Sequence, residues 1–217
     1  MKARARRLEG RFVVVEGLDG AGTTTQSRRL ADRLRASGRK VHVTAEPSGG
    51  PIGAIARLVL AKRISGDAQS GSGFDPGALA LLFAADRLDH VASEIAPLLA
   101  EGVDVISDRY TLSSLAYQSI TSGDPAWVEA VNARARAPDV TIFLKVSPRT
   151  AVGRRFTESS RRELFEVPAF QRKVARSYER GIARLRAAGE RVEVVDGEQD
   201  VAAVTDALAA IVEQLRR

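Results

Sequence analysis

The sequence predicts a three-layer α/β domain with a five-stranded parallel sheet, and three observations lead to this fold class. Short apolar runs rich in β-branched residues alternate along the chain with longer amphipathic segments. Glycine or proline stands at most of the junctions. The chain has 217 residues, 44% of them hydrophobic, which suits one ordinary core. Strands that alternate with helices pair in parallel, because each helix returns the chain to the same end of the sheet.

In the first half of the chain, strands are expected over residues 12–15, 41–44 and 103–108. A glycine-containing loop follows the first strand and leads into a helix over residues 24–37, which Gly38 ends. The second strand is followed by a helix over residues 52–62. Each strand is thus followed by a helix, as a parallel sheet requires.

The segment of residues 62–77 is rich in glycine, serine and aspartate, so we expect a surface loop there. Asp75 and Pro76 have the residue types of an N-cap and a first helical position. They open a long helix that is expected to run to about residue 100, with Pro97 near its end.

In the second half, helices are expected over residues 111–120 and 127–137, with a break at residues 123–125. The fourth strand is expected over residues 140–146, where Pro148 closes it. Further helices flank an arginine-rich stretch. The last two elements are a strand over residues 192–195 and an amphipathic helix over residues 201–215.

The net charge of +6 is concentrated in two segments. Residues 1–11 carry five bases and one acid, and residues 149–162 carry five arginines and one glutamate, leaving 23 bases and 25 acids elsewhere. No basic stripe alternates with aromatic residues, which argues against a nucleic-acid binder. The sequence has no run of 18 apolar residues, no secretory leader and no cysteine, so we expect a cytoplasmic protein without a membrane span. The expected organisation is a disordered tail over residues 1–11 and one domain over residues 12–217.

The loop after the first strand occupies the place of the GxxxxGK[ST] phosphate-binding motif. In such loops backbone N–H groups surround phosphate oxygens, and the helix N-terminus adds positive potential. Position 23 is threonine where the motif has lysine, so no charge can be placed between the β- and γ-phosphates. The next hydroxyl is one that these loops give to Mg²⁺. Taken alone, the loop could equally be a strand-to-helix turn without a ligand. The nucleotide-binding candidates are Gly17, Leu18, Asp19, Gly20, Ala21, Gly22, Thr23, Thr24 and Thr25.

Residues 16–22, 46–50, 83–87 and 108–110, read together, resemble thymidylate kinases in order and approximate spacing. Each segment is weak evidence alone, but four in register are specific. The resemblance implies transfer of the γ-phosphoryl group of ATP to dTMP with Mg²⁺, giving dTDP. It also implies a P-loop kinase fold, which commonly forms homodimers.

Asp108 ends an apolar strand, and ligands meet the carboxyl ends of parallel strands. Its carboxylate can hold Mg²⁺ together with Thr24, and the guanidinium of Arg109 can bind a phosphate through two N–H groups. An ordinary ion pair at a strand end is the alternative. The resemblance places this segment at the metal and the acceptor phosphate. Asp19 would approach the acceptor sugar or the metal, or would cap the glycine turn.

Phe83 and Arg87 lie four residues apart and so share one helix face, where they could stack a pyrimidine and hydrogen-bond its edge. From the pattern alone, a core role for Phe83 is the stronger reading. The resemblance instead assigns both to thymine, with Tyr117 crowding the 2′ position. The expected acceptor-binding residues are Asp19, Glu46, Pro47, Arg57, Phe83, Arg87, Arg109, Ser114, Tyr117 and Gln118.

An arginine-rich lid over the ATP phosphates is expected at about residues 149–165. We expect Arg155 and Arg161 or Arg162 to reach the phosphates, and hypothesise that they replace the missing lysine charge. With Asp19 and Arg109 they form the catalytic set. Ala45 and Lys145 also depart from the family pattern.

The threonine at position 23 keeps other functions open, since losing one preorganised cation costs about 10²–10³ in rate. The chain could be a weak or inactive nucleotide-binding relative. It could also be a kinase for another nucleoside monophosphate or for a deoxynucleoside. No switch loop or base-reading signature supports a GTPase. His42 and His90, on an expected strand and helix, have no metal-ligand spacing.

Overall fold

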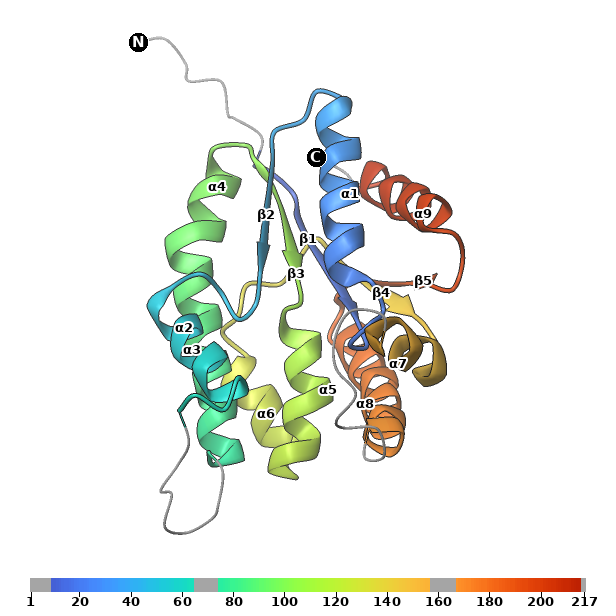
Figure 1. Cartoon of the computed structure of the whole chain (residues 1–217). Helices are drawn as coiled ribbons and strands as arrows, with labels where there is room; N and C mark the ends of the chain where they lie inside the picture. The colour runs from blue at the N-terminus through green and yellow to red at the C-terminus, as the bar shows by residue number, and fades with distance from the viewer. Residues whose placement is uncertain (1–8, 65–73, 157–166, 216–217) are drawn as a thin grey trace, which may run out of the picture.

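The computed structural model describes residues 9–64, 74–156 and 167–215 (Figure 1). These residues form a five-stranded parallel sheet in the order β2-β3-β1-β4-β5. Helices cover both faces of the sheet, so the predicted fold class is confirmed. The strands are β1 (Phe12–Gly17), β2 (Val41–Ala45), β3 (Asp104–Asp108), β4 (Val140–Lys145) and β5 (Val192–Asp196).

The helices fall on two sides of the sheet. Helices α1 and α9 pack on each other and on one face, whereas α4, α5 and α8 pack on the other. Helix α2 packs on α3, away from the sheet. The helices are α1 (Thr23–Ala36), α2 (Pro51–Leu60), α3 (Pro76–His90), the π-helical turn η1 (Val91–Ile95), α4 (Ala96–Ala100), α5 (Thr111–Ser122), α6 (Pro125–Asn132), α7 (Pro148–Phe156), α8 (Val167–Ala187) and α9 (Val201–Glu213).

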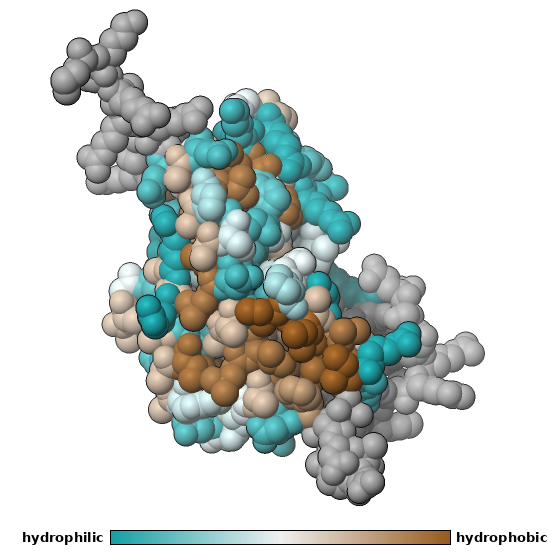
Figure 2. Space-filling model, turned by 90° about the vertical axis from the view of Figure 1, so that its left-hand side faces the viewer, coloured by the Kyte–Doolittle hydropathy of each residue, from teal (hydrophilic) through white to brown (hydrophobic). Residues whose placement is uncertain are grey.

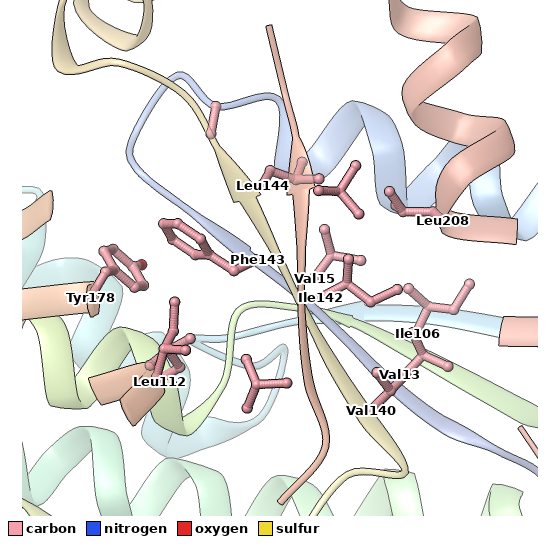
Figure 3. Packing of buried hydrophobic residues seen from close by; sticks show 14 of the residues in the cluster. Val13, Val15, Ile106, Leu112, Val140, Ile142, Phe143, Leu144, Tyr178 and Leu208 are labelled. Atoms are coloured by element: carbon pink, nitrogen blue, oxygen red, sulfur yellow. The ribbon is translucent and has the colours of Figure 1, made fainter. Parts of the chain in front are cut away.

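Alternation along β1 divides the core into two clusters. Val13 and Val15 join the larger cluster with residues of α1 and α9, whereas Phe12 and Val14 join a smaller one with residues of η1 and α4. Both sets are fully buried, as expected for a central strand of a parallel sheet. Figure 3 shows the aromatic side chain of Phe143 directed toward Tyr178 of α8, whose ring centroid lies 4.9 Å away.

The long helix expected up to residue 100 is divided. Asp75 caps it as predicted, accepting a hydrogen bond from the N–H of Ala78 at 2.8 Å. The α-helical hydrogen-bond pattern changes to a π-turn over Val91–Ile95, just before Pro97 in α4. Proline has no N–H to donate to the carbonyl of Ser93, four residues earlier, so the regular ladder cannot continue there.

Two expectations near residue 130 are wrong in their bounds. Helix α6 begins at Pro125 and ends at Asn132, whereas the sequence indicated residues 127–137. It begins earlier because Asp124 accepts from the N–H of Trp127 at 3.0 Å and caps the helix. It ends earlier because Asp139 must reach β1, where its side chain accepts from the N–H of Phe12 at 2.6 Å. Pro148 follows β4, as expected, and is also the first residue of α7.

Arg11, which the sequence placed in the basic tail, belongs to the folded domain. Its side chain is buried, and its guanidinium donates to the carbonyls of Val212 and Leu215 at 2.9 and 3.0 Å. Its backbone N–H donates to Asp104 at 2.9 Å. The local charge pattern could not reveal this, because the partners lie about as far along the chain as possible. Residues 1–8 lie outside the described part of the chain.

The parallel register brings the carboxyl ends of the strands to one edge of the sheet. Val15 of β1 pairs with Asp108 at the end of β3, and Ala45 at the end of β2 pairs with the same residue. The chain segments that leave this edge are therefore neighbours in space although they are distant in sequence. The predicted site residues lie on these segments and on the helices beside them. Among the described residues, no helix is both long enough and apolar enough to cross a membrane.

Candidate active site

The loop between β1 and α1 leaves little room for side chains. A Cβ atom on Gly17 would lie 2.8 Å from the Cβ of Ala21, so this position requires glycine. Gly22 has a φ of 91° and precedes the first turn of α1, where no side chain caps the helix. The first N–H groups of α1 are thus available to an anion.

A cavity of about 600 Å³ lies beside this loop. Residues 19–25 form one wall, and the other walls come from α7, the segment after β5 and the start of α9. The lining residues are Asp19, Gly20, Ala21, Gly22, Thr23, Thr24, Thr25, Gln26, Arg109, Arg154, Gly197, Gln199, Val201 and Val204. Thr23 is buried, and it occupies the position where the motif has its cation.

Thr24 lines this cavity and contacts Asp108, which lines a neighbouring cavity of about 550 Å³ together with Thr24. The hydroxyl of Thr24 donates to Oδ2 of Asp108, although the two residues are 84 positions apart. The other carboxylate oxygen, Oδ1, is buried and has no hydrogen-bond partner in the described chain. A buried carboxylate oxygen without a donor is unfavourable in a dry site but is a good ligand for Mg²⁺, which prefers oxygen. These residues therefore fit the predicted metal.

Arg109 has an unusual backbone, with a φ of 76°, a conformation that residues other than glycine rarely adopt. Its side chain lies half-buried between the two halves of the site. Nη2 donates to Oδ1 of Asp19 at 2.7 Å, while Nη1 lies 3.1 Å from the carbonyl oxygen of Gly17. Nη1 also lies 3.2 Å from the hydroxyls of Ser113 and Tyr178.

Glu16 is fully buried close to the charge of Arg109. Its Oε1 accepts from the backbone N–H groups of Tyr110 and Ser113, each at 2.9 Å. Its Oε2 accepts from the hydroxyls of Ser113 at 2.6 Å and Tyr178 at 3.2 Å. Burial raises the pKa of Glu16, while the charge of Arg109 and these donors oppose the shift. The hydrogen bonds orient the start of α5 and thereby the backbone at Arg109.

A second cavity of about 280 Å³ lies on the other side of Arg109. Its lining combines apolar side chains with several polar groups, as a small-molecule site requires. The lining residues are Asp19, Glu46, Pro47, Leu60, Phe83, Arg87, Arg109, Tyr110, Ser113, Ser114, Tyr117 and Gln118. Asp19 and Arg109 line both cavities, so the two spaces meet at this pair.

Arg87 is buried at the end of the second cavity. Its Nε and Nη2 both donate to Oε2 of Glu46, at 2.9 and 2.7 Å, and Nη2 also donates to Ser114 at 3.1 Å. Nη1 donates to Asn132 of α6, and the guanidinium lies over the ring of Tyr110 at 5.0 Å. The guanidinium is therefore held from four directions, which fits recognition of one planar ligand edge.

Most of the predicted residues come together in these two cavities, and some do not. Leu18 points into the core, and Gly17 contributes its carbonyl to Arg109 and Tyr178. Arg57 is exposed and is not among the lining residues of the second cavity. It donates to the carbonyls of Pro47 (at 3.0 Å) and Ser48, so it holds the segment that carries Glu46. Arg161, Arg162 and the side chain of Arg155 lie outside the described residues.

The structure also shows residues that the sequence did not indicate. Arg154 of α7 lines the first cavity and donates to the carbonyl of Gly197 at 3.1 Å. The arginine cluster was the available signal, but it did not distinguish this member from its neighbour. Leu60 adds an apolar wall to the second cavity, and Tyr178 joins α8 to Glu16. Their roles depend on packing between distant elements, for which a single sequence has no local signal.

Comparisons with known proteins agree on one family. A family model described as thymidylate kinase matches residues 15–208. A putative thymidylate kinase of Aeropyrum pernix is 39% identical over 86% of this chain and 86% of that protein. A probable thymidylate kinase of Pyrobaculum calidifontis is 38% identical over 94% of this chain and 96% of its own length. One from Pyrobaculum aerophilum is 37% identical over 95% and 98%, respectively.

Proposed function

The chain belongs to the thymidylate kinase family, and we propose that its site transfers the γ-phosphoryl group of ATP to dTMP, giving dTDP and ADP. One observation carries the proposal. Two cavities meet at Asp19 and Arg109, and one of them adjoins a phosphate-binding loop. A kinase for a monophosphate needs this arrangement, because donor and acceptor phosphates must approach in line.

The larger cavity fits ATP. Its wall of residues 19–25 ends in the uncapped N-terminus of α1, which favours phosphate groups. Arg154 adds a positive charge at the same cavity, beside the carbonyl oxygens of Ala21 and Gly197. The far wall near Gln199 and Val201 leaves room for the rest of the nucleotide.

The smaller cavity fits dTMP. Phe83, Pro47 and Leu60 offer apolar surface to a pyrimidine, and Arg87 with Gln118 offers hydrogen bonds to its edge. Tyr117 lines the same cavity, and its ring centroid lies 5.8 Å from the guanidinium of Arg109, so it would contact the sugar of a nucleotide whose phosphate binds Arg109. At the junction the guanidinium of Arg109 can orient the acceptor phosphate, and one oxygen of that phosphate then attacks the γ-phosphorus while ADP leaves.

Thr24 and Asp108 are the residues that would hold Mg²⁺, for the reason already given by the unpartnered Oδ1 of Asp108. When bound, the metal neutralises charge on the ATP phosphates. The carboxylate of Asp19 accepts a hydrogen bond from Arg109 and so fixes the direction of the guanidinium.

Thr23 leaves the phosphate loop without a cation, and we propose that arginines of the lid supply this charge. We expect Arg155, Arg161 or Arg162 to supply positive charge in the closed state, and Arg154 joins them as a candidate because it lines the cavity. Steady-state dTMP phosphorylation by the four single alanine variants tests this proposal. If none lowers kcat by more than about threefold, the lid does not replace the lysine.

Product analysis separates the family activity from its alternatives. The protein is incubated with ATP, Mg²⁺ and one acceptor from dTMP, dUMP, UMP, CMP and thymidine, and nucleoside diphosphates are quantified. We expect dTDP as the main product. Tight binding of dTMP and ATP by calorimetry without dTDP would instead indicate an inactive relative.

We also propose a homodimer that covers an apolar surface on α2 and α3. Figure 2 shows apolar side chains gathered on this face of the molecule. Six large apolar side chains are exposed on α2, on the turn that follows it and on α3, namely Ile55, Leu58, Leu60, Ile64, Leu81 and Leu88. Such a patch is unusual for a monomer, and one surface meeting its own copy closes into a dimer.

Analytical ultracentrifugation tests the assembly. Leu58→Glu and Leu81→Glu should both give monomers, whereas Val201→Glu, equally exposed but on α9, should leave the mass unchanged. A wild type that sediments as a monomer would contradict the proposal. Cytoplasmic location and the absence of a nucleic-acid role stay predictions of the sequence.

A further inference from the structure

A line of polar contacts joins the surface near β2 to the second cavity, and His90 lies in its middle. His90 is at the end of α3, and its side chain is fully buried. Its Nδ1 lies 3.3 Å from Oε1 of Glu46, and its Nε2 lies 2.8 Å from the hydroxyl oxygen of Thr44. The other oxygen of Glu46 binds Arg87, which lines the cavity.

The hydrogen bonds around His90 define its protonation. An ionised carboxylate such as Glu46 only accepts, so Nδ1 must carry a proton. Nε2 lies 2.8 Å from the hydroxyl oxygen of Thr44, which can either donate to Nε2 or accept from it. Nδ1 of His90 is therefore the nitrogen that must be protonated, and it donates to Glu46.

The charges that face His90 from the neighbouring elements agree with this state. Glu46 follows β2, Glu94 is in η1 with Oε1 3.7 Å from Nε2, and Asp86 lies one turn earlier on α3. Burial by itself would lower the pKa of His90, but these three carboxylates outweigh it and raise the pKa. Arg87, the nearby cation on the same helix, is paired with Glu46 at 2.7 Å.

His42 ends the line at the surface. It lies on β2 and its Nε2 is 2.7 Å from Oε1 of Glu94. Its side chain is 40% exposed, so it can exchange protons with water. Among the described residues, His42 forms its side-chain hydrogen bond with Glu94 and none with Glu46 or Arg87, which makes it a control for effects that act through Glu94 alone.

We propose that His90 is a positioning residue for the acceptor, holding Glu46 and through it the guanidinium of Arg87 in the orientation that binds the pyrimidine base. This inference rests on the proposed function, since the second cavity must receive a pyrimidine nucleotide. Both Nε and Nη2 of Arg87 share one oxygen of Glu46, so the guanidinium follows any rotation of that carboxylate. His90 fixes the rotation by binding the other oxygen.

Two near-isosteric variants separate this role from a general packing role. In His90→Asn the amide nitrogen can take the place of Nδ1 and keep the bond to Glu46. In His90→Gln it can take the place of Nε2, keeping the bond to Thr44 and losing the one to Glu46. We expect His90→Gln to raise the KM and Kd for dTMP by about tenfold, the effect of one hydrogen bond to a charged group. His90→Asn should change them less than about threefold, and kcat and the KM for ATP should stay within about twofold in both.

His42→Gln is the matched control and should leave the KM for dTMP within about twofold of the wild type. Equal effects of the two His90 variants, no effect of either, or a fall in kcat without a change in KM would each overturn the proposal. Binding of dTMP is also measured by calorimetry. If the wild type binds dTMP but forms no dTDP, the proposed reaction fails while the positioning role is still decided by Kd.

One measurement needs no substitution at His90. The chain has two histidines, so His42→Gln leaves a single imidazole in a long-range ¹H–¹⁵N spectrum. At about pH 7 we expect Nδ1 of His90 to show the shift of a protonated nitrogen, as its hydrogen bond to Glu46 requires. An unprotonated Nδ1 would overturn the proposal even if the His90 variants failed to fold.

Discussion

Replacing Arg109 by lysine keeps the positive charge at the junction of the two cavities and removes the planar fork. The guanidinium of Arg109 reaches Asp19 at 2.7 Å through one nitrogen and Gly17, Ser113 and Tyr178 at 3.1 to 3.2 Å through the other. A lysine ammonium is a single point on a flexible chain, so it can retain the ion pair with Asp19 or approach the acceptor phosphate, but it cannot form the fork. The backbone strain is unchanged, because lysine has the same preference against a positive φ.

The cost to folding should be small, because each abandoned partner keeps another hydrogen bond. The carbonyl of Gly17 still accepts from the hydroxyl of Tyr178 at 2.9 Å, and the hydroxyl of Ser113 still donates to Glu16 at 2.6 Å. We therefore expect a loss of about 1 kcal/mol in the free energy of unfolding. Losing one preorganised donor aimed at transferred charge costs about 10²–10³ in rate. At 1.36 kcal/mol for each factor of ten, this is about 3–4 kcal/mol.

The assay measures kcat/KM for dTMP from ADP release, together with urea unfolding of the same preparations. Arg184→Lys is the matched control, because Arg184 is exposed, lines neither of the two cavities, and forms an ion pair with Glu129 at 2.9 Å. It should change neither quantity measurably. If Arg109→Lys lowers kcat/KM less than about fivefold, the fork does not orient the acceptor phosphate. If the variant loses several kcal/mol of stability instead, Arg109 is chiefly structural.

Three further predictions concern the phosphate loop, the N-terminal boundary and pH. Alanine at Arg155, Arg161 or Arg162 should lower kcat less when Thr23→Lys is also present, because the lysine restores the charge that the lid supplies. Additive losses of kcat in this double-mutant cycle would argue against replacement of the lysine by the lid. Arg11→Ala should lower the free energy of unfolding by about 2–3 kcal/mol, since two buried carbonyls at the end of α9 lose a charged donor. Removal of residues 1–8 should leave kcat unchanged. A urea titration that finds Arg11→Ala as stable as the wild type would contradict the role of Arg11. The pKa of His90 is raised above its ordinary value of 6.5, so its stabilising contribution is complete below pH 6.5 and is lost as the pH rises through the folded-state pKa. His90→Gln should therefore lose less stability than the wild type between neutral and alkaline pH. Parallel plots of the free energy of unfolding against pH would refute this.

Much of the fold could be predicted from local patterns. β1, the phosphate loop and α1 follow from an apolar β-branched run, closely spaced glycines and a helical apolar period, all within about 25 neighbouring residues. Asp75 was assigned as a helix cap because the capping hydrogen bond spans three residues. The early end of α6 was missed, because it depends on the hydrogen bond between Asp139 and Phe12 of a distant strand. The π-turn at Val91–Ile95 was missed, because Pro97 was expected only near the end of one continuous helix.

The candidate site was predicted unevenly for the same reason. The motifs indicated which segments carry the chemistry, and Phe83, Arg87, Ser114 and Gln118 do line one cavity. They did not indicate that Arg57 holds the backbone near Pro47, or that Arg154 is the arginine that lines the nucleotide cavity. A charged side chain has a long reach, and its partner is decided by which elements pack beside it.

The sequence by itself determined the fold class, the phosphate loop without its lysine, and the family to which the chain belongs. Only the tertiary structure decided that Asp19 and Arg109, 90 residues apart, join two cavities, and that His42 and His90 meet at one carboxylate. The physical reason is that periodicity and turn chemistry act over a few residues of chain. Charge pairing and cavity shape, in contrast, depend on which strand ends the sheet brings together.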